Sequence, residues 1–144
     1  MLSVKVHRYG AIAGASYFGR TMLLPRILLV DDVLLVRDSL RSLLATGPME
    51  VCGEAENGQQ AMAKVMELKP DVVILDITMP VMDGLKATME IRRIAPGTKI
   101  VLFTIHDSSE AKTAAKIVGA DALVPKGTAS RDLLPVLLSL TRVH

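Results

Sequence analysis

Aromatic side chains are scarce in this sequence: Phe, Tyr and Trp make up 3% of its 144 residues, and Trp is absent. The single cysteine, Cys52, excludes an intramolecular disulfide framework and suits a reducing compartment, so a cytoplasmic location is expected. No run approaches the roughly 20 apolar residues of a membrane-spanning helix, so no membrane contact is expected. Because 50% of the residues are nevertheless apolar, the chain can bury one core built from aliphatic side chains.

Acidic side chains are missing from the first 30 residues, which hold four basic ones. The rest of the chain has 13 basic and 15 acidic side chains and is therefore mildly acidic. A protein that binds nucleic acid usually presents a concentrated basic face. We therefore expect no direct contact between this chain and nucleic acid.

Residues 1–25 differ from the remainder because glycines and small side chains interrupt any helical period. The apolar run at 11–15 is too short for the core of a secretory signal. We expect a flexible N-terminal extension over 1–25, followed by one domain over 26–144. A rival interpretation, in which the extension packs on the domain or on a partner, stays open.

From Arg26 onward, short apolar runs typical of buried strands alternate with segments of helical spacing. Strands are predicted at 27–30, 50–55, 72–76, 99–104 and 122–125, and helices at 33–45, 58–68, 85–94, 109–118 and 130–141. The second strand is more polar and is expected at a sheet edge. Since parallel neighbours need right-handed crossovers, the pattern predicts an α/β, flavodoxin-like (βα)5 three-layer sandwich with strand order 2-1-3-4-5.

Polar residues follow the predicted strands at the edge where such sheets bind ligands. Asp31 and Asp32 end the first strand, Asp76 the third and Thr104 the fourth, and Lys126 follows the fifth. Clustered carboxylates repel one another unless a cation lies among them, and hard oxygen ligands of this kind suit Mg²⁺. A carboxylate nucleophile beside Mg²⁺ and a lysine is equipped for phosphoryl transfer.

Some of these residues have a simpler interpretation when each is taken alone. Asp32 can cap the following helix, Asp83-Gly84 can be a plain turn, and Lys126 can be a solvated side chain. The joint appearance of polar residues at the ends of four strands favours a site over these separate explanations.

Four motifs carry a family resemblance: ILLVDD at 27–32, VVILDITMPVMDG at 72–84, VLFT at 101–104 and VPKG at 124–127. They resemble the receiver domain of bacterial two-component response regulators, which has the fold of the chemotaxis protein CheY. The likeness runs from Arg26 to the C-terminus. The segments GEAENGQQA and GADALVPKGTASRDLL are most similar to receivers of regulators with a LuxR-type DNA-binding output.

The resemblance implies that Asp76 accepts a phosphoryl group from a sensor histidine kinase or phosphotransfer protein, forming an acyl phosphate. Asp76 is expected to project from its strand so that the donor can reach it in line. The resemblance also implies that Asp32, Asp76 and the backbone carbonyl of Thr78 ligate Mg²⁺, with Asp31 assisting through a bound water.

Two further roles are implied, together with one departure from the family. Lys126 would pair with the phosphoryl oxygens, and the Thr104 hydroxyl would swing toward them and pull its loop along. Leu123 stands where the family usually has Tyr or Phe, so activation is expected to run through other packing.

The favoured hypothesis is a phosphorylation-controlled switch, not an enzyme, which contacts a downstream protein or a second copy in a homodimer. It would act alone or as the regulatory part of a transcriptional regulator. One alternative is a degenerate receiver that serves as an unphosphorylated dimerisation module, which Leu123 favours. The other is a metal-dependent aspartyl phosphohydrolase. Hydrolases of the haloacid dehalogenase type carry a second aspartate two residues after the first, and Thr78 occupies that position here.

Overall fold

The computed structural model describes residues 16–17, 20–21, 23–105 and 107–142. Its main element is a five-stranded sheet made of β3 (Arg26–Val30), β4 (Glu50–Ala55), β5 (Val72–Asp76), β6 (Lys99–Thr104) and β7 (Ala122–Pro125). The strands pair in parallel in the order β4-β3-β5-β6-β7. This arrangement confirms the predicted flavodoxin-like order 2-1-3-4-5 and places the more polar β4 at an edge.

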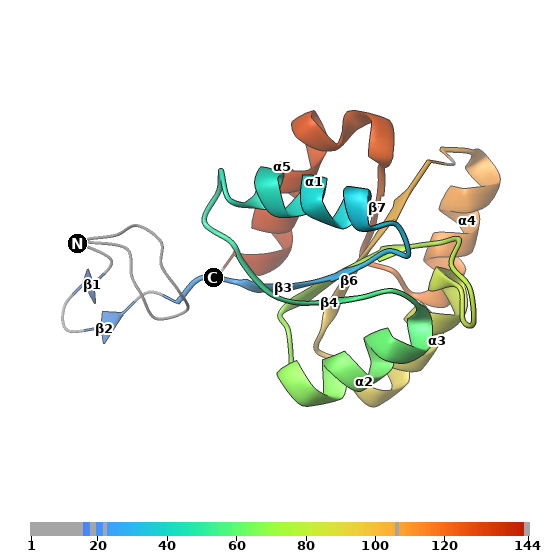
Figure 1. The fold of residues 1–144 in the computed structure, drawn as a ribbon, viewed down its shortest axis with the longest axis horizontal. Coiled ribbons are helices and arrows are strands. Elements are labelled where there is room, and N and C mark those ends of the chain that lie inside the picture. The colour runs from blue at the N-terminus through green and yellow to red at the C-terminus, as the bar shows by residue number, and fades with distance from the viewer. Residues whose placement is uncertain (1–15, 18–19, 22, 106, 143–144) are drawn as a thin grey trace.

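Helices cover both faces of the sheet: α1 (Leu34–Leu44), α2 (Gly58–Leu68), α3 (Gly84–Ile94), α4 (Ser109–Val118) and α5 (Ala129–Thr141). In Figure 1, α1 and α5 lie on one face and α2, α3 and α4 on the other, which gives three layers. The predicted bounds are correct to within one residue, with helix starts at 34, 84 and 129 in place of 33, 85 and 130. A 3-10 turn, Lys126–Thr128, precedes α5 and was not expected.

Capping side chains explain where three of the helices begin. Asn57, Asp83 and Ser108 each accept a hydrogen bond from the backbone N–H three residues ahead, at 2.8, 2.9 and 3.1 Å respectively. Asp83 is therefore the cap of α3 and more than part of a plain turn. At the other end of α4, Gly119 has a φ of 87°, in the left-handed region that glycine adopts without strain.

The core has one cluster of buried aliphatic side chains on each face of the sheet, because alternate strand residues point to opposite sides. Ile27 and Ile74 pack in one cluster with Leu40 of α1 and Leu133 of α5, and Leu75 packs in the other. The central strand β5 is buried along its whole length and has Asp76 as its last residue. The core thus anchors the strand that carries this carboxylate.

Ahead of the main sheet, β1 (Ser16–Tyr17) and β2 (Arg20–Thr21) pair antiparallel as a separate two-stranded ribbon. These strands were not predicted, since two residues are too few to show a period. The expected flexibility of the extension stays a prediction, because residues 1–15, 18–19 and 22 lie outside the described part of the chain. Among the helices that the structure describes, none has the length and apolar character needed to cross a membrane.

Candidate functional site

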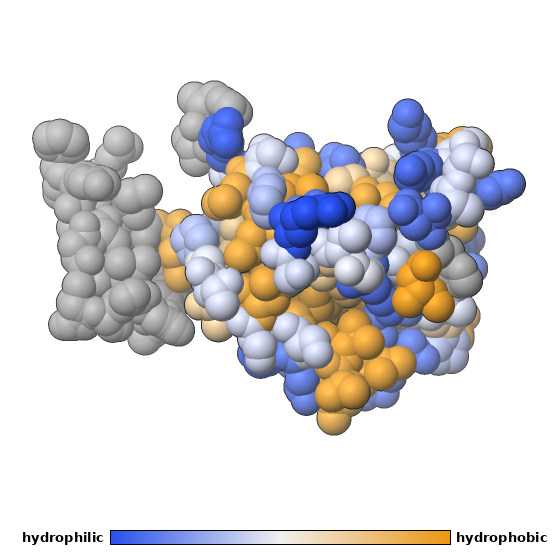
Figure 2. Space-filling model, turned by 90° about the horizontal axis from the view of Figure 1, so that it is seen from above, coloured by the Kyte–Doolittle hydropathy of each residue, from blue (hydrophilic) through white to orange (hydrophobic). Residues whose placement is uncertain are grey.

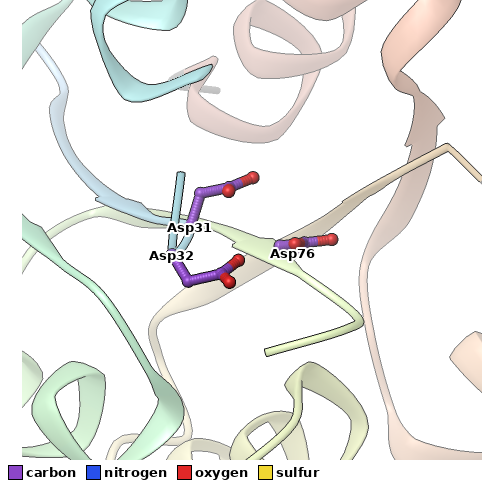
Figure 3. Close-up of side chains that lie close together, drawn as sticks. All are labelled: Asp31, Asp32 and Asp76. Atoms are coloured by element: carbon purple, nitrogen blue, oxygen red, sulfur yellow. The ribbon is translucent and has the colours of Figure 1, made fainter. Parts of the chain in front are cut away.

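Three aspartates converge at the carboxyl edge of the sheet, at the ends of the neighbouring strands β3 and β5. Asp31 and Asp32 directly follow β3, and Asp76 ends β5. Each offers one carboxylate oxygen, and these oxygens lie within 4.8 Å of one another. Figure 3 shows the three side chains extending in the same general direction from the two strand ends. The fold thus brings together acidic residues that are far apart in the sequence.

The three carboxylates differ in exposure. Asp31 is 1% exposed and Asp76 is 7% exposed, whereas Asp32 is open to solvent. Asp76 was expected to project from its strand so that a donor can reach it in line, and this stays a prediction. Its carboxyl group lies beside Asp31 and Lys126 at the end of a fully buried strand, so only a small part of it reaches solvent.

Lys126 joins this acidic cluster from the 3-10 turn that follows β7. Its Nζ atom lies 2.7 Å from Asp31 Oδ2 and 3.5 Å from Asp76 Oδ2. Thr104 ends β6 in register with Pro125, the residue before Lys126, and is 1% exposed. The ends of β3, β5, β6 and β7 therefore meet at one edge of the sheet.

The acidic cluster changes the proton affinity of Asp76. Burial raises the pKa of Asp76 above its ordinary value, and the negative charge of Asp31 raises it further. Lys126 lowers this pKa, as does the Thr78 N–H, which donates to Asp76 Oδ1 at 3.4 Å. The net shift is upward, so one lysine does not offset burial and crowding. A further cation among these carboxylates would favour the charged form of Asp76.

The loop after β5 packs closely against the backbone of Asp76. A Cβ atom added at Gly84 would lie 2.1 Å from the Asp76 carbonyl oxygen, so no other residue fits there without a shift. The Gly84 N–H donates to the Ile77 carbonyl at 2.7 Å and closes the loop. Met79 is buried and belongs to the core cluster beneath α2 and α3. These residues give the carboxylate a well-packed support.

Two expectations about single residues have different outcomes. The residue that precedes α1 as its cap is Val33, which makes no side-chain cap bond, and its N–H donates to Asp31 Oδ1 at 2.9 Å. The interpretation of Asp32 as a helix cap is therefore wrong. Thr78, two residues after the end of β5, is exposed, and the role of its carbonyl as a ligand stays a prediction.

A groove of about 460 Å³ lies beside the acidic cluster, between α1 and the start of α5. Its lining includes Leu35 and Leu40 of α1, Phe103 of β6, and Lys126. The Lys126 Nζ atom lies 5.8 Å from the centroid of the Phe103 ring, within cation–π range. Figure 2 views this side of the molecule and shows apolar side chains in patches among charged ones. The groove and the acidic cluster share Lys126.

An exposed apolar surface at the start of α1 was not expected from the sequence. Val33, Leu34 and Leu35 are 46%, 58% and 73% exposed, and they directly follow the acidic pair. Three adjacent large apolar side chains in solvent, beside a polar site, are typical of an interaction surface.

Arg37 is a second residue that was not expected near the site. It is charged, yet it is only 8% exposed. A signal for it was present in the sequence, because Arg37 shares helical spacing with the buried Leu40 and Leu44 and so lies on the core-facing stripe of α1. A charge in such a place needs a partner inside the fold.

The chemistry of the donor set fits a hard divalent cation. Within the described ranges, Asp31, Asp32 and Asp76 are the one group of acidic, His or Cys side chains placed to hold a metal ion. Carboxylates together with water molecules are the ligands that Mg²⁺ prefers in proteins. The exposure of Asp32 leaves one side of the group open to solvent and so to an ion.

Comparison with known proteins decides the family of this fold and site. The family model for the response regulator receiver domain matches residues 27–137, which include almost the whole sheet. The chain belongs to the response regulator receiver family. The resemblance carried by the four sequence motifs is therefore confirmed.

Two curated relatives show which kinds of protein this chain is similar to. The chain is 47% identical over 77 residues to the chemotaxis protein CheY of Thermotoga maritima, covering 54% of this chain and 64% of that protein. It is 40% identical over 120 residues to the protein-glutamate methylesterase/protein-glutamine glutaminase 1 of Methanosarcina mazei, covering 81% of this chain and 32% of that protein. The chain thus spans less than two thirds of the length of either relative, and the second relative is an enzyme by name.

A solved structure supports the LuxR-type side of the resemblance. The crystal structure of a two-component response regulator of the LuxR family from Aurantimonas sp. SI85-9A1 is 31% identical and superposes with a TM-score of 0.77. The match covers 81% of this chain and 84% of that one. CheY-like and LuxR-type receivers are therefore both relatives of this chain.

The residue that departs from the usual receiver pattern, Leu123, lies on β7. It is half-buried and packs against the core cluster on the side of α2, α3 and α4. An aliphatic side chain at this place fills core space. The consequence of its identity for activation stays a prediction.

Proposed function

We propose that this receiver accepts a phosphoryl group on Asp76 and uses the modification to change its contacts with other proteins. The observation that carries the proposal is the acidic cluster with its single lysine. Three carboxylate oxygens lie within 4.8 Å of one another, and the Lys126 Nζ atom lies 3.5 Å from Asp76 Oδ2. This combination holds a nucleophile, ligands for a cation, and a positive group for a phosphate oxygen.

In the proposed reaction, a carboxylate oxygen of Asp76 attacks the phosphorus of a phosphohistidine in line with its P–N bond. The O–P bond forms as the P–N bond breaks, and the electron pair of that bond returns to the imidazole nitrogen, which takes up a proton. Lys126 pairs with the oxygens of the transferred group. Asp32, Asp76 and the Thr78 carbonyl, with Asp31 assisting through a bound water, would hold Mg²⁺, whose charge would offset the negative charge of the phosphoryl group.

The proposed output follows from the charge that the modification adds. An acyl phosphate carries close to two negative charges where the ionised carboxylate carried one, and it brings several acceptor oxygens to the carboxyl edge of the sheet. Thr104 is the hydroxyl donor on the adjacent strand, and it is followed by Ile105, which is 73% exposed. We expect Thr104 to turn toward the phosphoryl group and the segment between β6 and α4 to move with it.

The exposed surface of α1 supports docking of the phosphoryl donor. Val33, Leu34 and Leu35 present apolar area directly beside Asp32, so a donor that covers them comes close to the acidic cluster. A sensor histidine kinase or a phosphotransfer protein is the expected donor. Because the chain spans only part of its relatives, the downstream contact is proposed only as a protein or a second copy.

The test is incubation of the protein with acetyl phosphate or phosphoramidate and Mg²⁺, followed by intact mass spectrometry. The wild type is expected to gain one phosphoryl group, and Asp76→Asn is expected to gain none. Asp38→Asn is a matched control, because it removes one exposed carboxylate from α1, outside the acidic cluster. Chelation of the divalent ion with EDTA is expected to suppress the wild-type reaction.

The same experiment separates the two alternatives. A wild type that stays unmodified under these conditions would support the degenerate module, for which Leu123 is the motivating residue. Steady release of phosphate over many turnovers would support the aspartyl phosphohydrolase. A stable adduct that depends on Asp76, with slow release of phosphate, would agree with the proposed switch.

A further inference from the structure

Arg37 is the one basic side chain among the buried polar and charged residues of the described ranges. Its guanidinium Nη1 donates to the backbone carbonyl of Asp31 at 2.6 Å. Its Nε donates to Glu54 Oε1 at 2.7 Å. One buried side chain on α1 therefore connects the end of β3, where the acidic pair stands, to the edge strand β4.

The burial of this charge is offset by a carboxylate that is itself held in place. Glu54 accepts from Arg37 through Oε1 and pairs with Arg41 through Oε2. The pKa of Glu54 is lowered, first by the hydrogen bond from Arg41 and also by that from Arg37, so Glu54 is charged at neutral pH. Burying an arginine is costly unless it has such a partner. The pair thus fixes the direction in which Arg37 points.

Asp31 is held by hydrogen bonds on each of its polar groups. Its N–H donates to Ala55 O at 3.1 Å, its Oδ1 accepts from Val33 N–H, and its Oδ2 accepts from Lys126. The bond from Arg37 to its carbonyl oxygen completes the set. That carbonyl belongs to the peptide that joins Asp31 to Asp32, so a bond that fixes it also fixes the start of the next residue.

We propose that Arg37 is a positioning residue for the metal and phosphoryl site. With Glu54, it holds the Asp31 carbonyl so that the carboxylates of Asp31 and Asp32 stay within reach of Asp76. This inference rests on the proposed function, because the positioned groups are the proposed ligands of Mg²⁺. Groups that orient metal ligands from behind typically change metal affinity by about 10- to 100-fold when they are removed.

The test compares Arg37→Met with Arg41→Met in the full chain. Both changes remove an arginine that binds Glu54, but only Arg37 also bonds to Asp31. Binding of Mn²⁺, used as a probe for Mg²⁺, is followed by the electron paramagnetic resonance signal of the free ion. Arg37→Met is expected to weaken Mn²⁺ binding by about tenfold, and Arg41→Met by less than about twofold.

A kinetic readout distinguishes positioning from general loss of stability. The rate of phosphorylation by acetyl phosphate is measured across a range of Mg²⁺ concentrations. For Arg37→Met, the Mg²⁺ concentration at half-maximal rate is expected to rise, while the maximal rate stays near that of the wild type. Because Mg²⁺ that binds the folded protein would also refold an unstable variant, the rates are measured at a temperature where circular dichroism shows wild type and variant to be fully folded without Mg²⁺. Under these conditions, a purely structural role of Arg37 would leave the Mg²⁺ dependence unchanged.

A second variant keeps the test decisive if Arg37→Met fails to fold. Arg37→Lys retains the charge but cannot bond to Asp31 and Glu54 with a planar fork, so its Mn²⁺ affinity is expected to lie between those of wild type and Arg37→Met. Wild-type Mn²⁺ affinity in a folded Arg37 variant would overturn the positioning role alone. A wild type that neither binds Mn²⁺ nor becomes phosphorylated would instead overturn the proposed function, and this inference with it.

Discussion

The aspartates at the two edges of the sheet differ in whether they share their hydrogen-bond donors with another carboxylate. At the amino edge, Asp121 Oδ2 accepts from Arg92 Nη2 at 2.7 Å and from the Ile100 N–H at 2.8 Å. At the same edge, Asp71 Oδ2 accepts from the Arg26 N–H at 2.7 Å. Each of these carboxylates has donors of its own, and their bonds join a strand to a neighbouring segment.

At the carboxyl edge, the carboxylates of the acidic cluster outnumber the basic side chains that pair with them. Asp31 and Asp76 share one lysine, Lys126, and Asp32 stands in the same group. Asp71 and Asp121 thus have hydrogen-bond donors that they do not share with another carboxylate, whereas the acidic cluster at the carboxyl edge would be more stable with another cation. An excess of negative charge is expected at a site that binds a cation, as in the proposed function. A purely structural edge has no need of such an excess.

The comparison is tested most strongly by removing the shared lysine. Lys126→Met leaves Asp31 as a buried carboxylate without its ion pair, and breaking a buried pair typically costs about 3 kcal/mol of unfolding free energy. We expect a loss of that size in urea unfolding with EDTA present. Added Mg²⁺ is expected to recover more stability in the variant than in the wild type. Equal stability of variant and wild type would show that Lys126 does not offset the acidic cluster.

The corresponding change at the amino edge is Asp121→Ala. It removes the acceptor for Arg92 and for the Ile100 N–H, and the loss of bonds with a charged partner is expected to cost about 2 kcal/mol. Added Mg²⁺ is expected to stabilise Asp121→Ala only as much as it stabilises the wild type, because the acidic cluster at the carboxyl edge is unchanged. Urea unfolding with and without Mg²⁺ measures both effects, with Asp38→Ala on exposed α1 as the control. A Mg²⁺-dependent gain that is larger in Asp121→Ala than in the wild type would remove the distinction between the edges.

The sequence was sufficient to predict the order of the strands and the meeting of the acidic residues. Proline and glycine residues end several of the helices and separate the apolar runs. The bounds of the predicted helices and strands were therefore correct to within one residue. Once the strand order is known, residues at strand ends must share an edge, which is why Asp31, Asp76 and Lys126 could be grouped without coordinates.

The sequence was not sufficient to predict how the side chains fill the space around this edge. Asp76 is 7% exposed and lies 3.5 Å from the Lys126 Nζ atom, and Lys126 belongs to the 3-10 turn at 126–128 that was not expected. The side chain of Arg37 on α1 bonds both to the Asp31 carbonyl, at the end of β3, and to Glu54 on β4. Local periodicity contains no information about such contacts between elements.

The third prediction is that removing a carboxylate at the carboxyl edge stabilises the protein, whereas removing Asp121 at the amino edge destabilises it. Asp76→Asn is expected to stabilise the metal-free protein at neutral pH, by less than either loss above, because burial and Asp31 raise the pKa of Asp76. A carboxyl group with a raised folded-state pKa favours folding only when it is protonated, so the advantage of the variant shrinks as the pH falls. Thermal unfolding in EDTA from neutral to acidic pH measures this difference. A lower melting temperature for Asp76→Asn at neutral pH would contradict the proposed crowding.

The smallest change in the free energy of unfolding is expected from Glu54→Gln. Glu54 lies near the carboxyl edge, but unlike Asp76 it pairs with two arginines, Arg37 and Arg41. The hydrogen bond from Arg41, followed by that from Arg37, lowers the pKa of Glu54 in the folded state. Its contribution to stability is therefore present above the ordinary pKa of a glutamate and is lost as the pH falls through the lowered folded value. The amide oxygen in Glu54→Gln can still accept the hydrogen bond from the buried Arg37, and Glu54 and Arg41 are partly open to solvent. We therefore expect less than about 1 kcal/mol at neutral pH.

The pH dependence of this last variant has the opposite sign to that of Asp76→Asn. The wild type is expected to be the more stable protein at neutral pH, and the difference is expected to vanish in acid. Urea unfolding of wild type and Glu54→Gln at several pH values, in EDTA, gives the two curves. If the variant gained stability at neutral pH, Glu54 would be another crowded carboxylate. Crowding would then affect all carboxylates near the carboxyl edge and not the acidic cluster alone. Glu54 would also no longer be a stable charged partner for Arg37, which the positioning role of Arg37 requires.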